Sequence, residues 1–271
     1  MTIENTSEAF GATPILSNKH YTESSVFTPE NLLREARRQK KLSSDPVPAI
    51  CILDPDGDLV DYLTAAGHAR LHAPWACYHT QLTTFVHKEI EYGIVGRVVG
   101  ASFAVLVAEE LFASGCQLLI SITSAGQITP VGQPPYFVLI DRALRDEGTS
   151  YHYIPPAPFC ALRPELAEPL RDLSDFGVQM HHGASWTTDA PFRETEAMIA
   201  VCRANDILAV EMEAAALYAL AQAKQYAIVC FAHVTNQMAQ QGDDFEKGPD
   251  QGNQAALQVI DHTARQLHYG V

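Results

Sequence analysis

The alternation of short apolar runs with helix-like segments constrains the fold of this chain more than any other sequence feature. The apolar runs are too short for helices and have the composition of buried strands, whereas Ala, Leu and Glu recur at helical spacing between them. No linker rich in Gly, Ser or Pro and no internal repeat divides the chain, so we expect one α/β domain around a mostly parallel sheet. The expected strands are 49–53, 118–122, 136–140 and 227–234, and the expected helices are 101–113 and 210–223.

The N-terminal part differs in character from the rest. Residues 1–46 are expected to form an arm followed by a helix, and residues 47–271 the α/β domain. The arm, up to about residue 25, has little periodicity. Thr28 and Pro29 then have the pattern of an N-cap and a first helical position.

Composition excludes several classes of partner. The chain has 271 residues, of which 47% are hydrophobic, so it can bury a large core. Its 18 Lys and Arg against 32 Asp and Glu give a formal charge of −14. Most of this surface would repel nucleic acid or an acidic membrane, and neither is expected as a partner. A small anionic substrate remains compatible with this charge if a few arginines are concentrated in a cleft.

Cysteine usage and hydropathy predict a cytoplasmic protein. The six cysteines form no Cys-x-x-Cys pair and stand mostly in apolar runs, as expected of reduced, buried thiols. The polar N-terminus resembles no signal peptide, and no stretch reaches about 18 consecutive apolar residues. We therefore expect neither export nor membrane insertion. No His and Cys cluster has metal-ligand spacing, so no metal is expected.

The residues that follow the predicted strands are the first candidates for function, because α/β sheets bind ligands beyond the carboxyl ends of their strands. After the strand at 118–122, the sequence Thr123-Ser124-Ala125-Gly126 is expected to form a turn. Its hydroxyls and backbone N–H groups could bind an oxyanion. Small residues are also common in such turns for steric reasons alone.

A second candidate is the segment Glu211-Met212-Glu213, at the junction of an apolar run and an Ala-rich helix. A carboxylate held in a cleft can accept both hydroxyls of a vicinal diol such as that of ribose, and Met can supply an apolar wall. Two glutamates that stabilise a helix N-terminus would give the same pattern. Both interpretations remain open from the residues alone.

Asn236 is the third candidate, because it follows the last predicted strand. A buried amide can donate to a carbonyl and accept from a ring N–H of one heterocycle. The alternative is an asparagine that only caps a loop.

These motifs occur in an order that resembles one enzyme family. Taken together, they are similar to the nucleoside phosphorylase and nucleosidase superfamily. The motifs are, in order, Gly100-Ala101-Ser102, Thr123–Gly126, Val210–Ala214 and Val234-Thr235-Asn236. That superfamily includes purine nucleoside phosphorylases, uridine phosphorylases and methylthioadenosine nucleosidases. The likeness runs from about Val47 to the C-terminus. It implies a single α/β domain with a central mixed, partly barrelled sheet flanked by helices, and assembly as a dimer, trimer or hexamer.

The resemblance also implies roles for single residues. Glu213 would bind the ribose diol and, with Asn236, act as a catalytic residue. Met212 and Trp186 would line the sugar and base pocket, and Asn236 would read the base. Ser124 would contact phosphate.

Further residues complete the set that the resemblance implies. Glu211 is assigned to substrate binding, and His20 of the arm to the 5′-hydroxyl of a neighbouring subunit's substrate. Gly100, Ser102 and Arg97 are assigned to phosphate. The chain departs from the phosphorylases of bacterial type, because the turn after the first strand has no arginine and Ser121 stands where they have another.

The resemblance predicts a nucleoside phosphorylase. Such an enzyme cleaves the N-glycosidic bond of a purine or pyrimidine ribonucleoside with orthophosphate as co-substrate, and it needs no cofactor. The products are the free base and ribose 1-phosphate. The absent arginines keep two alternatives open. One is a nucleosidase that uses water, with Glu211 or Glu213 activating the water, and the other is a non-catalytic nucleoside-binding protein.

Overall fold

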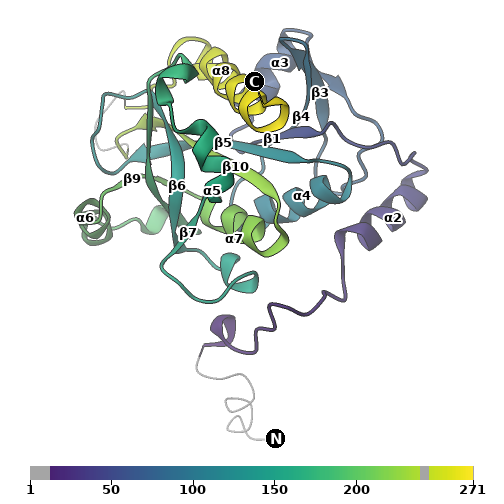
Figure 1. Cartoon of the computed structure of the whole chain (residues 1–271), viewed down its shortest axis with the longest axis horizontal. Coiled ribbons are helices and arrows are strands. Elements are labelled where there is room, and N and C mark those ends of the chain that lie inside the picture. Colours follow the sequence, from purple (N-terminus) through teal and green to yellow (C-terminus); the bar gives the residue numbers. More distant parts are fainter. Residues whose placement is uncertain (1–12, 239–243, 271) are drawn as a thin grey trace, which may run out of the picture.

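The structure is a computed structural model that describes residues 13–238 and 244–270, and a ten-stranded mixed sheet forms its centre (Figure 1). The strands are β1 Ile50–Asp54, β2 Arg70–Leu71, β3 Thr83–His87, β4 Ile90–Gly96, β5 Leu118–Gln127, β6 Tyr136–Asp146, β7 Phe159–Ala161, β8 Met180–Thr188, β9 Ile207–Glu211 and β10 Ala227–Asn236.

Half of the sheet closes on itself. The strand order β10-β6-β8-β9-β5 becomes a ring because β5 also pairs with β10, and β1, β4, β3 and β2 continue from β5 as an open extension. Five strand pairings are parallel and five are antiparallel. The mixed, partly barrelled sheet that the resemblance implied is therefore confirmed.

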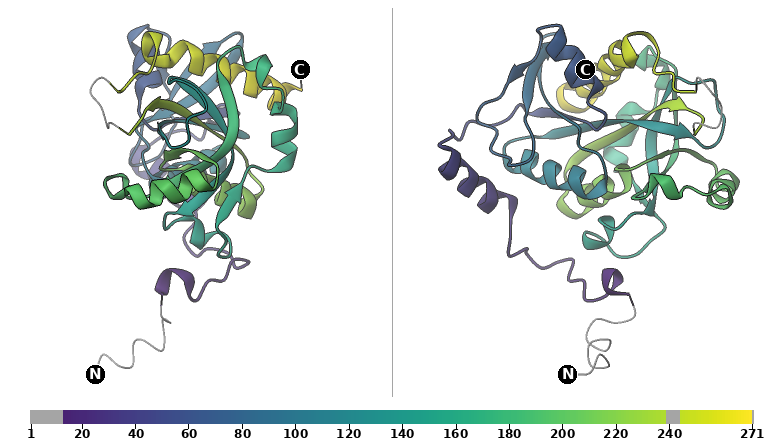
Figure 2. Two further views of the ribbon diagram at one scale, coloured as in Figure 1. Left: turned by 90° about the vertical axis from the view of Figure 1, so that its left-hand side faces the viewer. Right: turned by 180° about the vertical axis from the view of Figure 1, so that it is seen from behind.

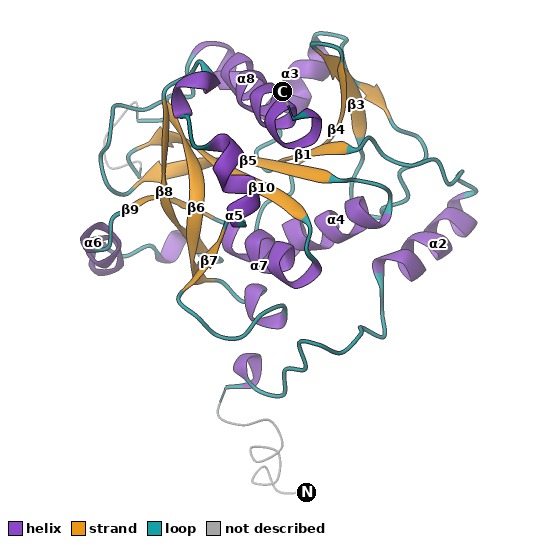
Figure 3. Ribbon diagram, viewed as in Figure 1, coloured by secondary structure: helices purple, strands orange, loops and turns teal. Residues whose placement is uncertain are grey.

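Helices cover the sheet on both sides (Figure 3). Helices α3 and α8 contact each other on one side, and α4 packs beside α7 on the other. The helices are α2 Pro29–Lys40, α3 Asp58–Ala65, α4 Ala101–Ala113, α5 Pro164–Ala167, α6 Glu196–Ala204, α7 Ala214–Lys224 and α8 Asn253–Ala264. Short helical turns are η1 Pro14–Leu16, η2 Ser150–His152, η3 Glu168–Leu170, η4 Leu173–Phe176, η5 Pro191–Arg193, η6 Pro249–Gly252 and η7 Arg265–Tyr269.

The N-terminal segment lies outside this body. Figure 2 shows the stretch between η1 and α2 running along the outside of the molecule, with η1 close to η2. The Thr28 hydroxyl caps α2 by accepting the Asn31 N–H at 3.3 Å, as its sequence predicts. The division into residues 1–46 and 47–271 remains a prediction, and residues 1–12 of the predicted arm lie outside the described residues.

Sequence reasoning placed the interiors of the four expected strands well, but several ends were wrong. β6 continues to Asp146 and β10 to Asn236, and residues 210–211, expected in a helix, end β9. Residues 123–126, expected as a turn after a short strand, belong to β5. The reason is pairing, because β10 runs parallel to β5 as far as Gly126 and supplies the hydrogen bonds that keep it extended. All six cysteines are buried and unpaired, as expected. In the described ranges no helix combines the length and apolarity that crossing a membrane requires.

Two glycines with left-handed backbones allow a test of the packing behind β10. Gly252 has φ +76°, and a Cβ there would lie 2.3 Å from the His233 ring and 2.6 Å from the Lys247 carbonyl oxygen. Gly67 has φ +69° and no atom within 4 Å of the same position. We expect Gly67→Ala to cost about 1–2 kcal/mol of unfolding free energy, from backbone strain alone. Gly252→Ala should cost clearly more, measured by urea denaturation, and equal losses would contradict the packing described here.

Candidate active site

The pairing of β5 brings the predicted motifs together. In the parallel pair with β10, Ser124 lies opposite His233 and Gly126 opposite Asn236. In the short antiparallel pair with β9, Gly126 lies opposite Val210. The ends of β9 and β10 therefore both lie beside the second half of β5, although they are distant from it in sequence.

Glu211 is buried at the end of β9, and its carboxylate is fully engaged. One oxygen accepts the hydroxyls of Ser185 at 2.9 Å and Thr187 at 2.5 Å. The other accepts the backbone N–H groups of Glu213 and Ala214, both at 2.7 Å. These four bonds use the acceptor capacity of a carboxylate. The geometry thus assigns Glu211 to the N-terminus of α7, and not to the substrate contact or water activation that the sequence suggested for it.

Glu213 is equally buried but only half satisfied. Its Oε1 accepts the Gly100 N–H at 2.7 Å, and its Oε2 has no hydrogen-bond partner among the described residues. Burial raises the pKa of the Glu213 carboxyl, and the negative charge of Glu211 raises it further, while the Gly100 N–H, the Thr123 hydroxyl and the Met212 backbone lower it in part. A buried carboxylate oxygen without a donor is unusual in a folded protein. It favours the interpretation that a ligand hydroxyl belongs there.

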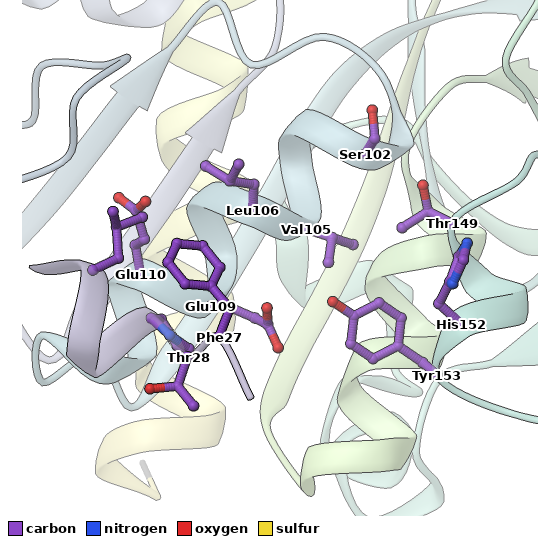
Figure 4. A pocket seen from close by; sticks show the side chains of 12 residues that line it. Phe27, Thr28, Ser102, Val105, Leu106, Glu109, Glu110, Thr149, His152 and Tyr153 are labelled. Atoms are coloured by element: carbon purple, nitrogen blue, oxygen red, sulfur yellow. The ribbon is translucent and has the colours of Figure 1, made fainter. Parts of the chain in front are cut away.

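Two of the residues expected to bind phosphate have other surroundings. Gly100 has φ +93°, which glycine adopts without strain, and it donates its N–H to Glu213. Ser102 is exposed and lines a pocket of about 390 Å³, which the other predicted site residues do not line. Figure 4 shows Ser102 at the rim of that pocket, with Phe27 and Tyr153 among its other side chains.

Ser124 lies within β5 and not in the expected turn, and a carboxylate of the chain itself occupies its donors. The Ser124 N–H donates to Asp56 Oδ2 at 2.9 Å, and the Ser124 hydroxyl donates to the same oxygen. Lys247 Nζ lies 3.8 Å from that oxygen and also pairs with Asp58. Sequence reasoning missed Asp56 and Lys247 as site residues. The sequence signal for such a site was the acidic turn directly after β1, which sequence reasoning interpreted only as a turn without arginine.

Arg97 is not brought to Ser124. Its guanidinium donates to Asp61 at 2.5 Å, and its side chain packs over Gly57. It lines a separate pocket of about 550 Å³ that includes residues of α3. The structure therefore offers no support for Arg97 as a phosphate ligand.

Trp186 and Met212 differ in their burial and in their surroundings. Trp186 is 2% exposed, packs in a small cluster with Ile199 and Val210, and donates its indole N–H to Asp146 at 3.0 Å. Its side chain belongs to the core and does not line an open pocket wall. Met212 is half-buried between the two glutamates of its motif.

Asn236 is the last residue of β10 and is buried. Its amide oxygen accepts the Met238 N–H at 2.9 Å, so it stabilises the turn after the strand. Its NH₂ group has only long contacts, at 3.3 Å to the Thr235 hydroxyl and 3.5 Å to the Ala125 carbonyl. The oxygen of this amide thus has the loop-capping role that the alternative interpretation gave to Asn236. Its NH₂ group is only weakly bound.

His20 lies on the exposed segment before α2, where it pairs with Glu23 at 3.5 Å. The chain alone does not bring it to Glu213, and its expected role at a neighbouring subunit stays a prediction. No group of three or more metal-ligating side chains occurs in residues 13–238 and 244–270.

Comparison with known proteins agrees with this arrangement. A sequence model of the Phosphorylase superfamily matches residues 49–265, and the chain belongs to this superfamily. An uncharacterized protein of Acanthamoeba polyphaga mimivirus is 24% identical over 187 residues, which cover 65% of this chain and 72% of that protein.

Solved structures show the same fold at low sequence identity. Uridine phosphorylase from Vibrio fischeri superposes with a TM-score of 0.67 at 18% identity, covering 84% of this chain and 94% of that one. Purine nucleoside phosphorylase from Toxoplasma gondii, in complex with immucillin-H, superposes with a TM-score of 0.67 at 17% identity, covering 81% and 90%.

The two glutamates should respond in opposite ways to the same substitution. Glu211→Gln places an NH₂ group among donors and should lower the unfolding free energy by about 1–3 kcal/mol. Glu213→Gln should instead raise stability at alkaline pH. In the folded protein Glu213 keeps its proton above its ordinary pKa of 4.5, so wild-type stability falls as the pH rises from that value toward the raised pKa. Gln cannot lose a proton and removes this fall.

Urea denaturation of both variants and the wild type at pH 5 and pH 8 measures these effects. The advantage of Glu213→Gln over the wild type should be small at pH 5 and larger at pH 8. A constant difference between the two pH values would show that Glu213 titrates normally in the folded protein.

Proposed function

We propose that this protein cleaves the N-glycosidic bond of a nucleoside. The observation that carries the proposal is the buried Glu213 carboxylate, which has one oxygen fixed by Gly100 and the other without a donor. A ribose hydroxyl would supply that donor. Membership in the Phosphorylase superfamily and the likeness to uridine and purine nucleoside phosphorylases support the choice of substrate class.

The residues suit the charge changes of this reaction. When the bond between C1′ and the base nitrogen breaks, its electron pair leaves with the base and positive charge develops on the ribose ring. Hydrogen bonds donated by the ribose hydroxyls favour the ionised form of Glu213, and its carboxylate, held in a buried site, then stabilises that charge through the same hydroxyls. The weakly bound NH₂ group of Asn236 can donate to the departing base. Both groups lie beside the second half of β5.

Two nucleophiles are candidates for attack at C1′. Orthophosphate, expected from the resemblance, would give ribose 1-phosphate. Water would give free ribose, with its proton passing to a base on the protein or to solvent. One observation favours water, because both donors of Ser124 are taken by Asp56 while Arg97 is paired with Asp61. We therefore place hydrolysis before phosphorolysis as the reaction of the native chain.

The purified protein should release free base from at least one of inosine, adenosine, uridine and methylthioadenosine. Glu213→Gln should lower kcat/KM by about tenfold or more, since charge-assisted hydrogen bonds of roughly 1.5–3 kcal/mol are lost. Each assay is run with and without orthophosphate, and free ribose is measured beside ribose 1-phosphate. Release that depends on phosphate would establish phosphorolysis.

The matched control for this assay is Glu30→Gln. Glu30 lies in the exposed first turn of α2, outside the site, so its loss should leave kcat/KM unchanged. Binding of a nucleoside without any product would establish the non-catalytic alternative. Full activity in folded Glu213→Gln would refute the ribose assignment.

Asn236→Asp tests which group contacts the base. A carboxylate can still accept the Met238 N–H, so the turn after β10 should persist, but it has no NH₂ group to donate to a 6-oxo group. A protonated acid at this position can bind N7 of either purine class. We expect the adenosine to inosine ratio of kcat/KM to rise by about tenfold, which corresponds to roughly 1.4 kcal/mol. An unchanged ratio with a lower melting temperature would identify Asn236 as a purely structural residue.

A further inference from the structure

The turn after β1 is built to aim one carboxylate at β5. Asp54, the last residue of β1, accepts the N–H groups of Gly57 at 3.2 Å and Val60 at 2.9 Å, and so fixes the turn and the start of α3. Asp56 lies inside this turn, and its carboxylate reaches Ser124, 68 residues later in the chain. The contact of Asp56 with Ser124 therefore follows from the local geometry of the turn and is not a chance surface pair.

Ser124 and Lys247 together form a cradle for an oxyanion. Ser124 offers a backbone N–H and a hydroxyl that converge on one oxygen, and Lys247 brings a positive charge to 3.8 Å from the same oxygen. Lys247 is held there by its backbone, because the neighbouring Glu246 donates its N–H to the Thr235 carbonyl at 2.8 Å. The Lys247 side chain is 21% exposed.

We propose that the Asp56 carboxylate is a built-in occupant of this cradle and excludes inorganic phosphate from it. Asp56 then determines the nucleophile of the reaction, an inference that rests on the function proposed above. Carboxylate and phosphate oxygens accept the same donors, so the chain satisfies the cradle with its own side chain. Phosphate can bind only if Asp56 is displaced or removed.

Space and charge both support this exclusion. The cavity lined by Asp54, Asp56, Asp58, Ser124 and His233 measures about 30 Å³. That volume holds roughly one or two water molecules and not a phosphate ion. Burial and then the charge of Lys247 lower the pKa of His233 to about 4, so this histidine is neutral at physiological pH. A phosphate dianion would therefore meet three carboxyl groups and one ammonium group.

The decisive experiment measures inorganic phosphate binding by calorimetry to the wild type and to Asp56→Ala. The substitution frees both Ser124 donors and removes the carboxylate that lies 3.8 Å from Lys247 Nζ, while Lys247 stays paired with Asp58. We expect the Kd for phosphate to fall by about tenfold or more relative to the wild type. Adding Lys247→Met to Asp56→Ala should reverse the gain. An unchanged Kd in folded Asp56→Ala would overturn the proposal.

Asp58→Ala is the matched control. It removes one carboxylate from the same turn and the same lysine partner, but Asp58 makes no bond to Ser124. Its Kd should stay within about threefold of the wild type, since Asp56 still occupies both Ser124 donors. An equal gain in Asp58→Ala would show that net charge, and not the cradle, governs phosphate binding. If Asp56→Ala does not fold, Asp56→Asn takes its place, because it removes the charge at almost constant volume.

An activity measurement separates this inference from the proposed function. Asp56→Ala should form ribose 1-phosphate in the presence of phosphate, whereas the wild type should form free ribose. If the wild type cleaves no nucleoside, the proposed function fails, while the calorimetry still decides whether Asp56 fills an anion cradle. Tight phosphate binding by the wild type would overturn the inference even if nucleosides are cleaved.

Discussion

The site depends above all on the four hydrogen bonds that surround the Glu211 carboxylate. They join β8, through two hydroxyls, to the first turn of α7, through two backbone N–H groups. A buried charge of this kind is tolerable only when its partners are complete. Because Glu213 stands at the N-cap of the same helix, the network also fixes the position and direction of the second carboxylate. The two neighbouring glutamates thus differ: Glu211 is fully hydrogen-bonded, and Glu213 keeps one oxygen without a partner among the described residues.

Part of the acidic composition of the chain is concentrated at this edge of the sheet. A cluster of aspartates follows β1, and the segment after β10 brings a lysine against two of them. The donors that a phosphate would need are present, but side chains of the protein itself accept them. In this member of the superfamily, Glu213 keeps one carboxylate oxygen without a hydrogen-bond partner in the part of the chain that the structure describes, whereas the donors of Ser124 are occupied by an aspartate of the chain itself.

Sequence reasoning reached the fold class, and it singled out Glu213 as a candidate, because both depend on local patterns. Alternating apolar runs determine the layers, and the Glu-Met-Glu motif lies at the junction of a strand and a helix. The full hydrogen bonding of Glu211, in contrast to Glu213, was not predictable, because it depends on Ser185 and Thr187 of another strand. The contact from Asp56 to Ser124 spans 68 residues and has no local signature. Residues 123–126 looked like a turn because only the neighbouring strand keeps them extended.

The closed ring formed by β5, β10, β6, β8 and β9 limits how the molecule can move when it takes up a ligand. Separating any two of these strands would break a continuous circuit of backbone hydrogen bonds, which is costly in a buried sheet. The wall that carries Ser124 and Asn236 is consequently the part of the site that is least free to change shape. The turn after β1 and the segment that carries Lys247 lie outside the circuit, so a displacement of either would break none of its strand pairs. The ring is therefore a fixed frame, and a change of shape on ligand binding is confined to the segments at its rim.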